Sequence, residues 1–187
     1  TERKKKGFMK YYILLIINLL IARFPDAVGE NGMVVSSHAL ASKVGIKILQ
    51  GGGNAIDAAI ATGFALAVVH PGAGNIGGGG FMVIRLADGT VTTIDFREKA
   101  PLAASSTMFQ DENGIFVKGS NRKGLKSVGV PGTVAGLYLA HEKYGSLPWA
   151  DLVQPSIDLA AKGFPMTDAL YSHALKTEEW PKSMDIM

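Results

Sequence analysis

A glycine-rich stretch, HPGAGNIGGGG at residues 70–80, contains the spacing that phosphate-binding loops use. Gly72, Gly74 and Gly77 spell G-x-G-x-x-G, a pattern that binds a pyrophosphate when a strand precedes it and a helix follows it. Here the order is reversed, because a helical pattern precedes the loop and a strand pattern begins at Phe81. The loop would meet the partially negative end of a helix, which argues against a dinucleotide site. The glycines are expected instead to allow a tight turn or a close approach of two backbones.

Threonine is a candidate nucleophile when it stands at a free N-terminus, where its own α-amino group acts as the base. Thr92 and Thr93 lie inside a strand pattern, and they are interpreted as strand formers. Thr1 precedes a basic tail, and it is interpreted as a fragment boundary. None of the three is predicted to be a nucleophile.

The histidines and one aspartate are expected to have structural roles. Four histidines lack the spacing of a metal site: His38, His70, His141 and His173. Two of them, His70 and His141, are predicted to lie near helix C-termini, where a cation interacts favourably with the helix dipole. Asp57 follows Asn54 by three residues and is predicted to cap a helix. We therefore predict no metal site and no catalytic histidine.

Arg97 is the strongest candidate for a binding residue. It comes directly after a predicted strand that ends at Phe96, a position from which loops often contribute to sites. A guanidinium group can bind a carboxylate through two parallel hydrogen bonds. From the residues alone, Arg97 either binds a ligand carboxylate or forms a structural ion pair with Asp95, Glu98 or another carboxylate. Glu98 either orients Arg97 or is a solvated charge.

Four helices are predicted to position these residues. Apolar residues at helical spacing indicate helices over residues 38–53, 54–70, 131–145 and 147–164. The first should end in a left-handed cap at Gly51, and Asn54 should open the second with a capping box. Gly145 should stop the third helix. Pro155 should mark a new start or a kink in the fourth.

Strand patterns indicate one hairpin and two shorter pieces. Residues 81–86 and 90–96 flank Asp88-Gly89, a dipeptide suited to a type I′ turn. Residues 33–36 and 115–117 are candidates for short strands. This mixture predicts a layered α/β fold of the α+β type, and it does not fit a doubly wound parallel sheet.

The basic residues are concentrated at the N-terminus. The 187 residues include 19 basic and 16 acidic residues. Six of the basic residues and one of the acidic residues precede residue 24, so the rest of the chain has 13 basic and 15 acidic residues. A nucleic-acid-binding surface is therefore not predicted. The basic tail and the apolar run at residues 11–22 predict an export signal over residues 1–28, with a membrane anchor as the alternative. With no cysteine, the chain has no thiol chemistry.

Four blocks resemble the γ-glutamyltranspeptidase family in order and spacing: GGNAIDAAIATGFALAVVHPGAGNIGGGGFMVI, DFREKAP, SVGVPGTVAGLYLAHEKYG and WADLVQPSIDLAAKGFP. The resemblance runs from about Met33 to Pro165. It implies that residues 29–187 are the N-terminal portion of the family's large subunit. It also implies an αββα sandwich of the N-terminal nucleophile hydrolase type, incomplete in this chain.

The resemblance further implies a function and a set of partners. Members transfer a γ-glutamyl group from glutathione or other γ-glutamyl compounds to water or to amino-acid and peptide acceptors. The nucleophile is a threonine at the start of a small subunit cut from the same precursor, so it is expected beyond Met187. Arg97 matches the arginine that binds the α-carboxylate of the γ-glutamyl group. The glycine run is expected to be a packing device near the nucleophile, and no cofactor is expected.

Two alternatives remain open at this point. A cephalosporin or glutaryl acylase would share self-cleavage and a related fold, and would also recognise a carboxylate-bearing acyl chain. A non-catalytic fragment is the alternative from another class. The fragment alone is expected to be inactive and poorly soluble, because its strand edges and apolar faces lack their partners.

Overall fold

The computed structural model describes residues 27–176, so Thr1 and all but the last two residues of the predicted export segment lie outside the described residues. Residues 27–33 belong to one unit and are irregular chain. All helices and strands described below belong to a second unit that begins at Val34. In the described part of the chain, no helix combines the length and apolar character needed to cross a membrane.

The first described helix, α2 (Ala39–Gln50), confirms the prediction for this segment. Its N-terminus is capped by His38, whose Nδ1 accepts a hydrogen bond of 3.2 Å from the Leu40 N–H. The predicted left-handed cap at Gly51 is wrong, because Gly51 has φ −78°. The left-handed residue is Gly52, with φ 92°, and the next N–H, that of Gly53, bonds to the Ile48 carbonyl. This is a Schellman ending, and it places the turn one residue later than predicted.

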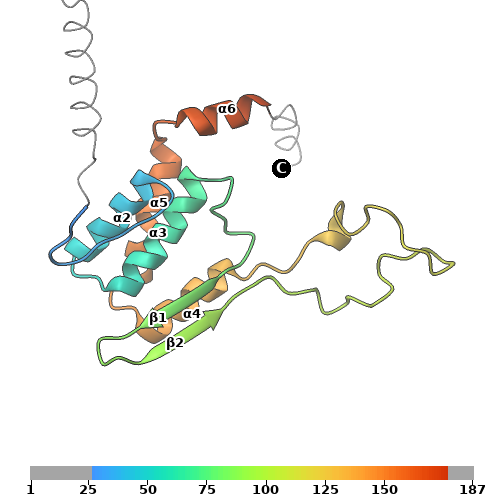
Figure 1. The fold of residues 1–187 in the computed structure, drawn as a ribbon, viewed down its shortest axis with the longest axis horizontal. Helices are drawn as coiled ribbons and strands as arrows, with labels where there is room; N and C mark the ends of the chain where they lie inside the picture. The colour runs from blue at the N-terminus through green and yellow to red at the C-terminus, as the bar shows by residue number, and fades with distance from the viewer. Residues whose placement is uncertain (1–26, 177–187) are drawn as a thin grey trace, which may run out of the picture. The chain divides into compact units, whose positions relative to one another are not determined.

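Helix α3 (Ala55–Val69) is the centre of the core. As predicted, Asn54 and Asp57 form a reciprocal capping box at its start. The helix is apolar on almost every side and contacts α2, α4 (Thr133–Tyr144) and α5 (Trp149–Lys162) (Figure 1). Ile60 and Val69 are among its buried residues, whereas Ala59 is exposed. The chain leaves α3 at His70, immediately before the glycine-rich loop.

The predicted hairpin is present. Strands β1 (Phe81–Arg85) and β2 (Val91–Asp95) pair antiparallel, with Phe81 opposite Asp95 (Figure 1). The predicted type I′ turn is wrong, because that turn needs two residues at positive φ and only Gly89, at φ 89°, has one. The Gly89 N–H bonds to the Leu86 carbonyl, so a three-residue loop with a left-handed glycine joins the strands.

Neither of the shorter strand candidates forms a strand. Residues 33–36 form no strand and have no partner strand in the described residues, and Val34 packs against the core from an irregular segment. Residues 115–117 contribute only an isolated bridge between Phe116 and Gln110. Alternating apolar residues predict an extended backbone, but a strand also requires a neighbour with free hydrogen-bonding groups.

Three further helices follow the long loop after β2. Helix α4 (Thr133–Tyr144) ends at Gly145 as predicted. Helix α5 (Trp149–Lys162) contains Pro155 in its interior, so the proline does not begin a new helix. Helix α6 (Asp168–Lys176) was not predicted from the sequence, and a short 3-10 helix, η1 (Leu125–Ser127), lies in the loop before α4.

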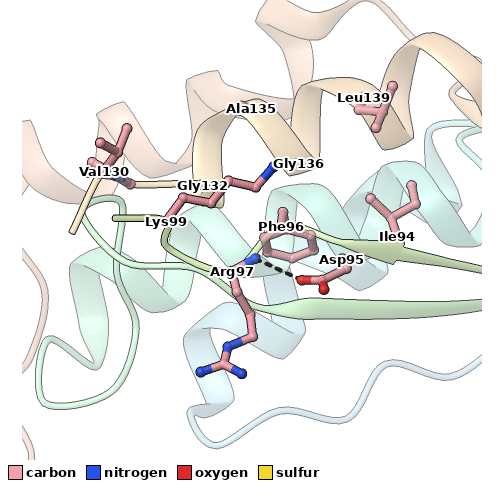
Figure 2. A pocket seen from close by; sticks show the side chains of 11 residues that line it. Ile94, Asp95, Phe96, Arg97, Lys99, Val130, Gly132, Ala135, Gly136 and Leu139 are labelled. Atoms are coloured by element: carbon pink, nitrogen blue, oxygen red, sulfur yellow. Dashed lines mark hydrogen bonds between the residues drawn. The ribbon is translucent and has the colours of Figure 1, made fainter. Parts of the chain in front are cut away.

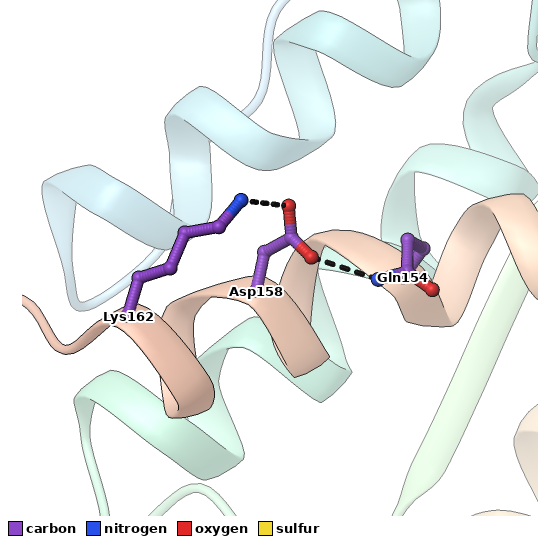
Figure 3. Close-up of polar contacts among 3 residues, drawn as sticks. All are labelled: Gln154, Asp158 and Lys162. Carbon is purple, nitrogen blue, oxygen red and sulfur yellow. Dashed lines mark hydrogen bonds and ion pairs between the residues drawn. The ribbon is translucent and has the colours of Figure 1, made fainter.

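The exposed side of α5 is held by a polar ladder. Asp158 accepts hydrogen bonds of 2.7 Å from Gln154 Nε2 and 2.8 Å from Lys162 Nζ (Figure 3). These bonds, the Lys162 bond first and the Gln154 bond second, hold the pKa of Asp158 below its usual value. Because the residues are spaced by four along a solvent-facing surface, the ladder contributes little to stability.

The observed architecture is a set of α-helices with one two-stranded antiparallel sheet. Strand β2 packs on α4, which lies behind the hairpin in Figure 1. The inward residues Ile84 and Ile94 are buried in the same core as Leu137 of α4. This confirms the predicted mixture of helices and an antiparallel hairpin, with helices on one face of the sheet.

Candidate functional site

Arg97 lies on the outer face of the hairpin, on the side away from the helices. Side chains alternate along β2, so Ile94 and Phe96 point toward α4 while Asp95 and Arg97 point outward. Figure 2 shows this alternation, with the Phe96 ring below α4 and the guanidinium group extending in the opposite direction. The strand therefore presents Arg97 on a surface that the described residues leave open.

The guanidinium group of Arg97 is not used by an ion pair in the described part of the chain. The side chain is exposed, and its Cζ lies 5.8 Å from the centre of the Phe81 ring, within range of a cation–π contact. Asp95 instead accepts a hydrogen bond of 3.1 Å from the backbone N–H of Arg97. The ion-pair alternative is thus not realised among the described residues, and the fork of donors faces solvent.

Glu98 is exposed and forms no hydrogen bond with Arg97 in the described residues. Its carboxylate lies instead beside the glycine-rich loop, where a Cβ on Gly78 would be 3.1 Å from Glu98 Oε1. Of the two readings of Glu98, this arrangement fits a solvated charge better than a residue that orients Arg97.

A pocket of about 270 Å³ lies between the end of β2 and the start of α4 (Figure 2). Its walls come from the β2 end, from the loop before α4 and from the first turns of α4: Ile94, Asp95, Phe96, Arg97, Lys99, Val130, Pro131, Gly132, Ala135, Gly136 and Leu139. Arg97 contributes to the lining, but its guanidinium group points away from α4. The pocket is therefore a neighbour of the candidate site and does not receive the guanidinium group.

The glycine-rich loop packs directly on the backbone that carries Arg97. A Cβ at Gly79 would lie 2.6 Å from the Phe96 carbonyl oxygen and 2.7 Å from both Arg97 Cα and the Glu98 nitrogen. Only glycine allows two main chains to approach this closely. The predicted packing role is confirmed, and so is the predicted order of helix, loop and strand, with α3 ending at Val69 and β1 beginning at Phe81.

The same loop is hydrogen-bonded to the start of α4. The Gly78 carbonyl accepts from the N–H groups of Gly132, at 2.7 Å, and Thr133, at 3.1 Å. The side-chain oxygen Asn75 Oδ1 accepts from the Gly78 N–H at 2.9 Å and from Thr133 Oγ1 at 2.6 Å. Neither Asn75 nor Thr133 was predicted from the sequence to be a site residue. The usable signal was an asparagine just before the glycine run, a position where its side chain often bonds the backbone two or three residues on.

Asp57 is a buried structural carboxylate, as predicted. It accepts hydrogen bonds from the Asn54 N–H at 3.0 Å and from the N–H and hydroxyl of Ser146, the last at 2.5 Å. Burial raises the pKa of Asp57, but the bonds donated by Ser146, Asn54 and Leu147 outweigh it and hold the pKa below its usual value. The carboxylate thereby ties the start of α3 to the turn between α4 and α5.

The remaining chemical candidates have structural positions. Thr92 and Thr93 lie in the middle of β2, which confirms their interpretation as strand formers. His70 follows the last residue of α3 and His141 is in the last turn of α4, as predicted. The His141 Nε2 lies 2.7 Å from the Leu147 carbonyl oxygen. His38 caps α2, and His173 lies in α6.

Comparison with known proteins extends these observations. The family model described as Gamma-glutamyltranspeptidase matches residues 41–184. A glutathione hydrolase proenzyme of Pseudomonas sp. (strain A14) is 60% identical over 135 residues, which cover 72% of this chain and 24% of that protein. The chain thus spans about a quarter of the length of the curated relatives it matches.

Solved structures resemble the fold described above. The γ-glutamyltranspeptidase of Helicobacter pylori aligns with a TM-score of 0.77 and 49% identity, over 83% of this chain and 44% of that one. A cephalosporin acylase from Bacillus halodurans aligns with a TM-score of 0.68 and 31% identity, over 88% of this chain and 31% of that one.

Proposed function

The chain belongs to the γ-glutamyltranspeptidase family, and on that premise we propose that it is part of the large subunit of a γ-glutamyltransferase and glutathione hydrolase. The family match over residues 41–184 is the observation that carries the proposal. Glutathione or another γ-glutamyl compound is the donor, and water, an amino acid or a peptide is the acceptor. A small subunit cut from the same precursor completes the site.

In the proposed reaction, the hydroxyl oxygen of the small subunit's N-terminal threonine bonds to the γ-carbonyl carbon of the donor. The bond from that carbon to the leaving amine breaks, and the hydroxyl proton passes through the threonine α-amino group to the amine. Water or an acceptor amine then attacks the resulting ester, which releases the γ-glutamyl group and returns a proton to the threonine. This chain contributes donor binding.

We assign donor binding to Arg97, which would hold the α-carboxylate of the γ-glutamyl group. Its exposed guanidinium group, unpaired in the described residues, supports the assignment. A free α-carboxylate matches the planar fork of an arginine through two charge-assisted hydrogen bonds. A lysine carries a single point charge and lacks the planar pair of donors, so it should bind the α-carboxylate less well than an arginine does.

The test uses the complete proenzyme, obtained from the gene that encodes this segment or by placing residues 41–184 in the Pseudomonas sp. (strain A14) relative. Arg97→Lys and Arg97→Ala are expected to raise KM for a γ-glutamyl anilide, the second by about 10-fold to 100-fold. Arg85→Ala is the matched control, because Arg85 lies at the far end of β1 on the same exposed face. An Arg97→Ala enzyme with an unchanged KM would remove Arg97 from the donor site.

The second candidate function is that of an acylase acting on a glutaryl side chain, which the likeness to the Bacillus halodurans acylase favours. A γ-glutamyl anilide and a glutaryl anilide differ only in the α-amino group. Turnover of the first at least 10-fold faster than the second supports the γ-glutamyl assignment, and the opposite preference replaces it with the acylase.

The finer features of fold and location are part of the same proposal. We infer that the outer face of the hairpin packs on a second sheet, as in an αββα sandwich, because Phe81, Val83 and Val91 are 66%, 74% and 61% exposed there. We also infer that residues 1–28 direct export, because basic residues precede the apolar run at 11–22. Fractionation of cells that express the whole protein tests the second inference, with the protein retained in the cytosol as the contrary result.

A further inference from the structure

Two glycines from different parts of the chain lie close against the Phe96–Arg97 backbone. A Cβ at Gly79 would be 2.6 Å from the Phe96 carbonyl oxygen and 2.7 Å from Arg97 Cα. A Cβ at Gly132 would overlap the same Phe96 carbonyl oxygen and lie 3.0 Å from the Arg97 carbonyl oxygen. Figure 2 shows Gly132 beside Phe96 and Arg97 at the start of α4. We call this arrangement the glycine clamp, consisting of Gly79, Gly132 and the Phe96–Arg97 backbone that both glycines contact.

Hydrogen bonds join the two glycine-containing segments of the glycine clamp, the glycine-rich loop and the start of α4. The Gly78 carbonyl, adjacent to Gly79, accepts from the Gly132 N–H at 2.7 Å and from the Thr133 N–H at 3.1 Å. Both donors belong to the first residues of α4, whose N–H groups have no partner within the helix. The clamp thus closes through the N–H groups at the start of α4, where Gly132 supplies no side chain to cap the helix.

A single side-chain oxygen completes this connection. Asn75 Oδ1 accepts from the Gly78 N–H at 2.9 Å and from the Thr133 hydroxyl at 2.6 Å, across 58 positions of sequence. The hydroxyl is buried, with Thr133 only 8% exposed, whereas Asn75 is exposed to solvent. The bond to Gly78 fixes the conformation of the loop, and the bond to Thr133 fixes the loop's place against α4.

We propose that Asn75 and Thr133 are positioning residues for Arg97: their hydrogen bond holds the glycine clamp closed and so fixes the backbone from which the guanidinium group extends. The inference rests on the proposed function, in which Arg97 binds the donor carboxylate. In this role the two residues act through the backbone of Arg97 and not by contact with the donor or acceptor. Their effect should therefore fall on donor binding and leave the chemistry of the acyl-enzyme unchanged.

The experiment compares Thr133→Val with Thr133→Ser in the complete proenzyme. Valine keeps the shape of the side chain and removes the hydroxyl, whereas serine keeps the hydroxyl. We expect Thr133→Val to raise KM for a γ-glutamyl anilide about fivefold, the effect of one lost hydrogen bond, and Thr133→Ser to remain within about twofold of wild type. Per titrated active site, kcat should change by less than twofold in both variants.

A double-mutant cycle tests whether the two residues act together. Asn75→Ala also removes the bond from the Gly78 N–H, so it should raise KM by at least the same factor as Thr133→Val. Asn75→Ala combined with Thr133→Val should be no worse than Asn75→Ala alone, because Asn75→Ala already removes the bond that Thr133→Val removes. If the increase in KM of the double variant equals the product of the two single increases, the two residues have independent roles and the proposal is overturned. If the Thr133→Val proenzyme does not accumulate, the KM of Asn75→Ser is measured in its place and compared with the KM of wild type.

The outcomes separate this inference from the proposed function. If wild type does not turn over γ-glutamyl donors, the proposed function fails. If wild type is active, Arg97→Ala is impaired and Thr133→Val has a normal KM, only the positioning role is overturned. A variant with fewer titrated sites but a normal KM identifies Thr133 as a folding residue, which also overturns the positioning role.

Discussion

Substitution of Gly79 tests the close approach between the glycine-rich loop and the strand that carries Arg97. A Cβ at this position would lie 2.6 Å from the Phe96 carbonyl oxygen and 2.7 Å from Arg97 Cα, whereas ordinary contacts begin at 3.4 Å. To bring the 2.6 Å contact to 3.4 Å, the two backbones would have to separate by about 0.8 Å, at a cost of about 1–3 kcal/mol in the free energy of unfolding for Gly79→Ala and more for Gly79→Val.

The separation has a second cost. Next to Gly79, the Gly80 carbonyl accepts from the Phe96 N–H at 3.0 Å, and the Gly80 N–H donates to the Phe96 carbonyl at 3.4 Å. Moving the loop outward lengthens both bonds, each of which contributes about 0.5–1.5 kcal/mol. Since the atoms in the way are backbone atoms, no side-chain rotation can relieve the contact.

The assay measures chemical unfolding and self-cleavage of the complete proenzyme. Gly77→Ala is the matched control, because a Cβ on Gly77 would meet no atom within 4 Å and should change the free energy of unfolding by no more than about 0.5 kcal/mol. Gly79→Val should lower stability and slow the appearance of the two subunits on a gel. If Gly79→Val and Gly77→Ala mature alike and are equally stable, the close approach is not a requirement of the fold.

Other predictions concern Asp57 and its surroundings. Asp57→Asn should destabilise the proenzyme by about 1–3 kcal/mol in chemical unfolding. The carboxylate accepts hydrogen bonds from N–H groups and from a hydroxyl, whereas the amide would turn its own donor toward them. Equal stability would contradict this. Ser146→Ala removes only the hydroxyl bond to Asp57 and should cost about 1 kcal/mol. Because folding lowers the pKa of Asp57, its contribution is complete above about pH 4 and is lost as the pH falls through the lower folded value. The stability difference between wild type and Asp57→Asn should therefore narrow below about pH 4, and a gap that stays constant in acid would argue against an ionised buried carboxylate. Lys162→Ala, which breaks the exposed pair with Asp158, should change stability by less than about 0.5 kcal/mol, and a larger loss would show that the ladder matters.

Local signals in the sequence were sufficient for much of the fold. Asn54 and Asp57 predict the start of α3, because both hydrogen bonds of the capping box join residues only three positions apart. The hairpin follows from alternating residues around Asp88-Gly89. The predicted turn type was wrong because residues 87–89 form a three-residue loop closed by the bond from the Leu86 N–H to the Thr90 carbonyl. Loop length is set by strand register, which the dipeptide alone does not determine.

The features that the sequence did not predict depend on distant partners. Residues 33–36 have an extended pattern, but no neighbouring strand in the described part pairs with them. The bond between Asn75 and Thr133 joins segments that only the packing of α4 on the hairpin brings together. Arg97 was singled out because it follows a predicted strand and matches the arginine of a family motif, both local signals, whereas the glycine clamp joins distant segments and needed the structure.

The central claim is that Arg97 binds the α-carboxylate of a γ-glutamyl donor. It is tested most directly by removing the carboxylate from the substrate and the arginine from the enzyme, separately and together. Turnover of a γ-glutamyl anilide is compared with that of the 4-aminobutyryl anilide, which lacks only the α-carboxylate, in wild type and in Arg97→Ala. Wild type should prefer the γ-glutamyl compound by about 10-fold to 100-fold in kcat/KM, and Arg97→Ala should lose most of that preference. A preference of the same size in both enzymes would contradict the account.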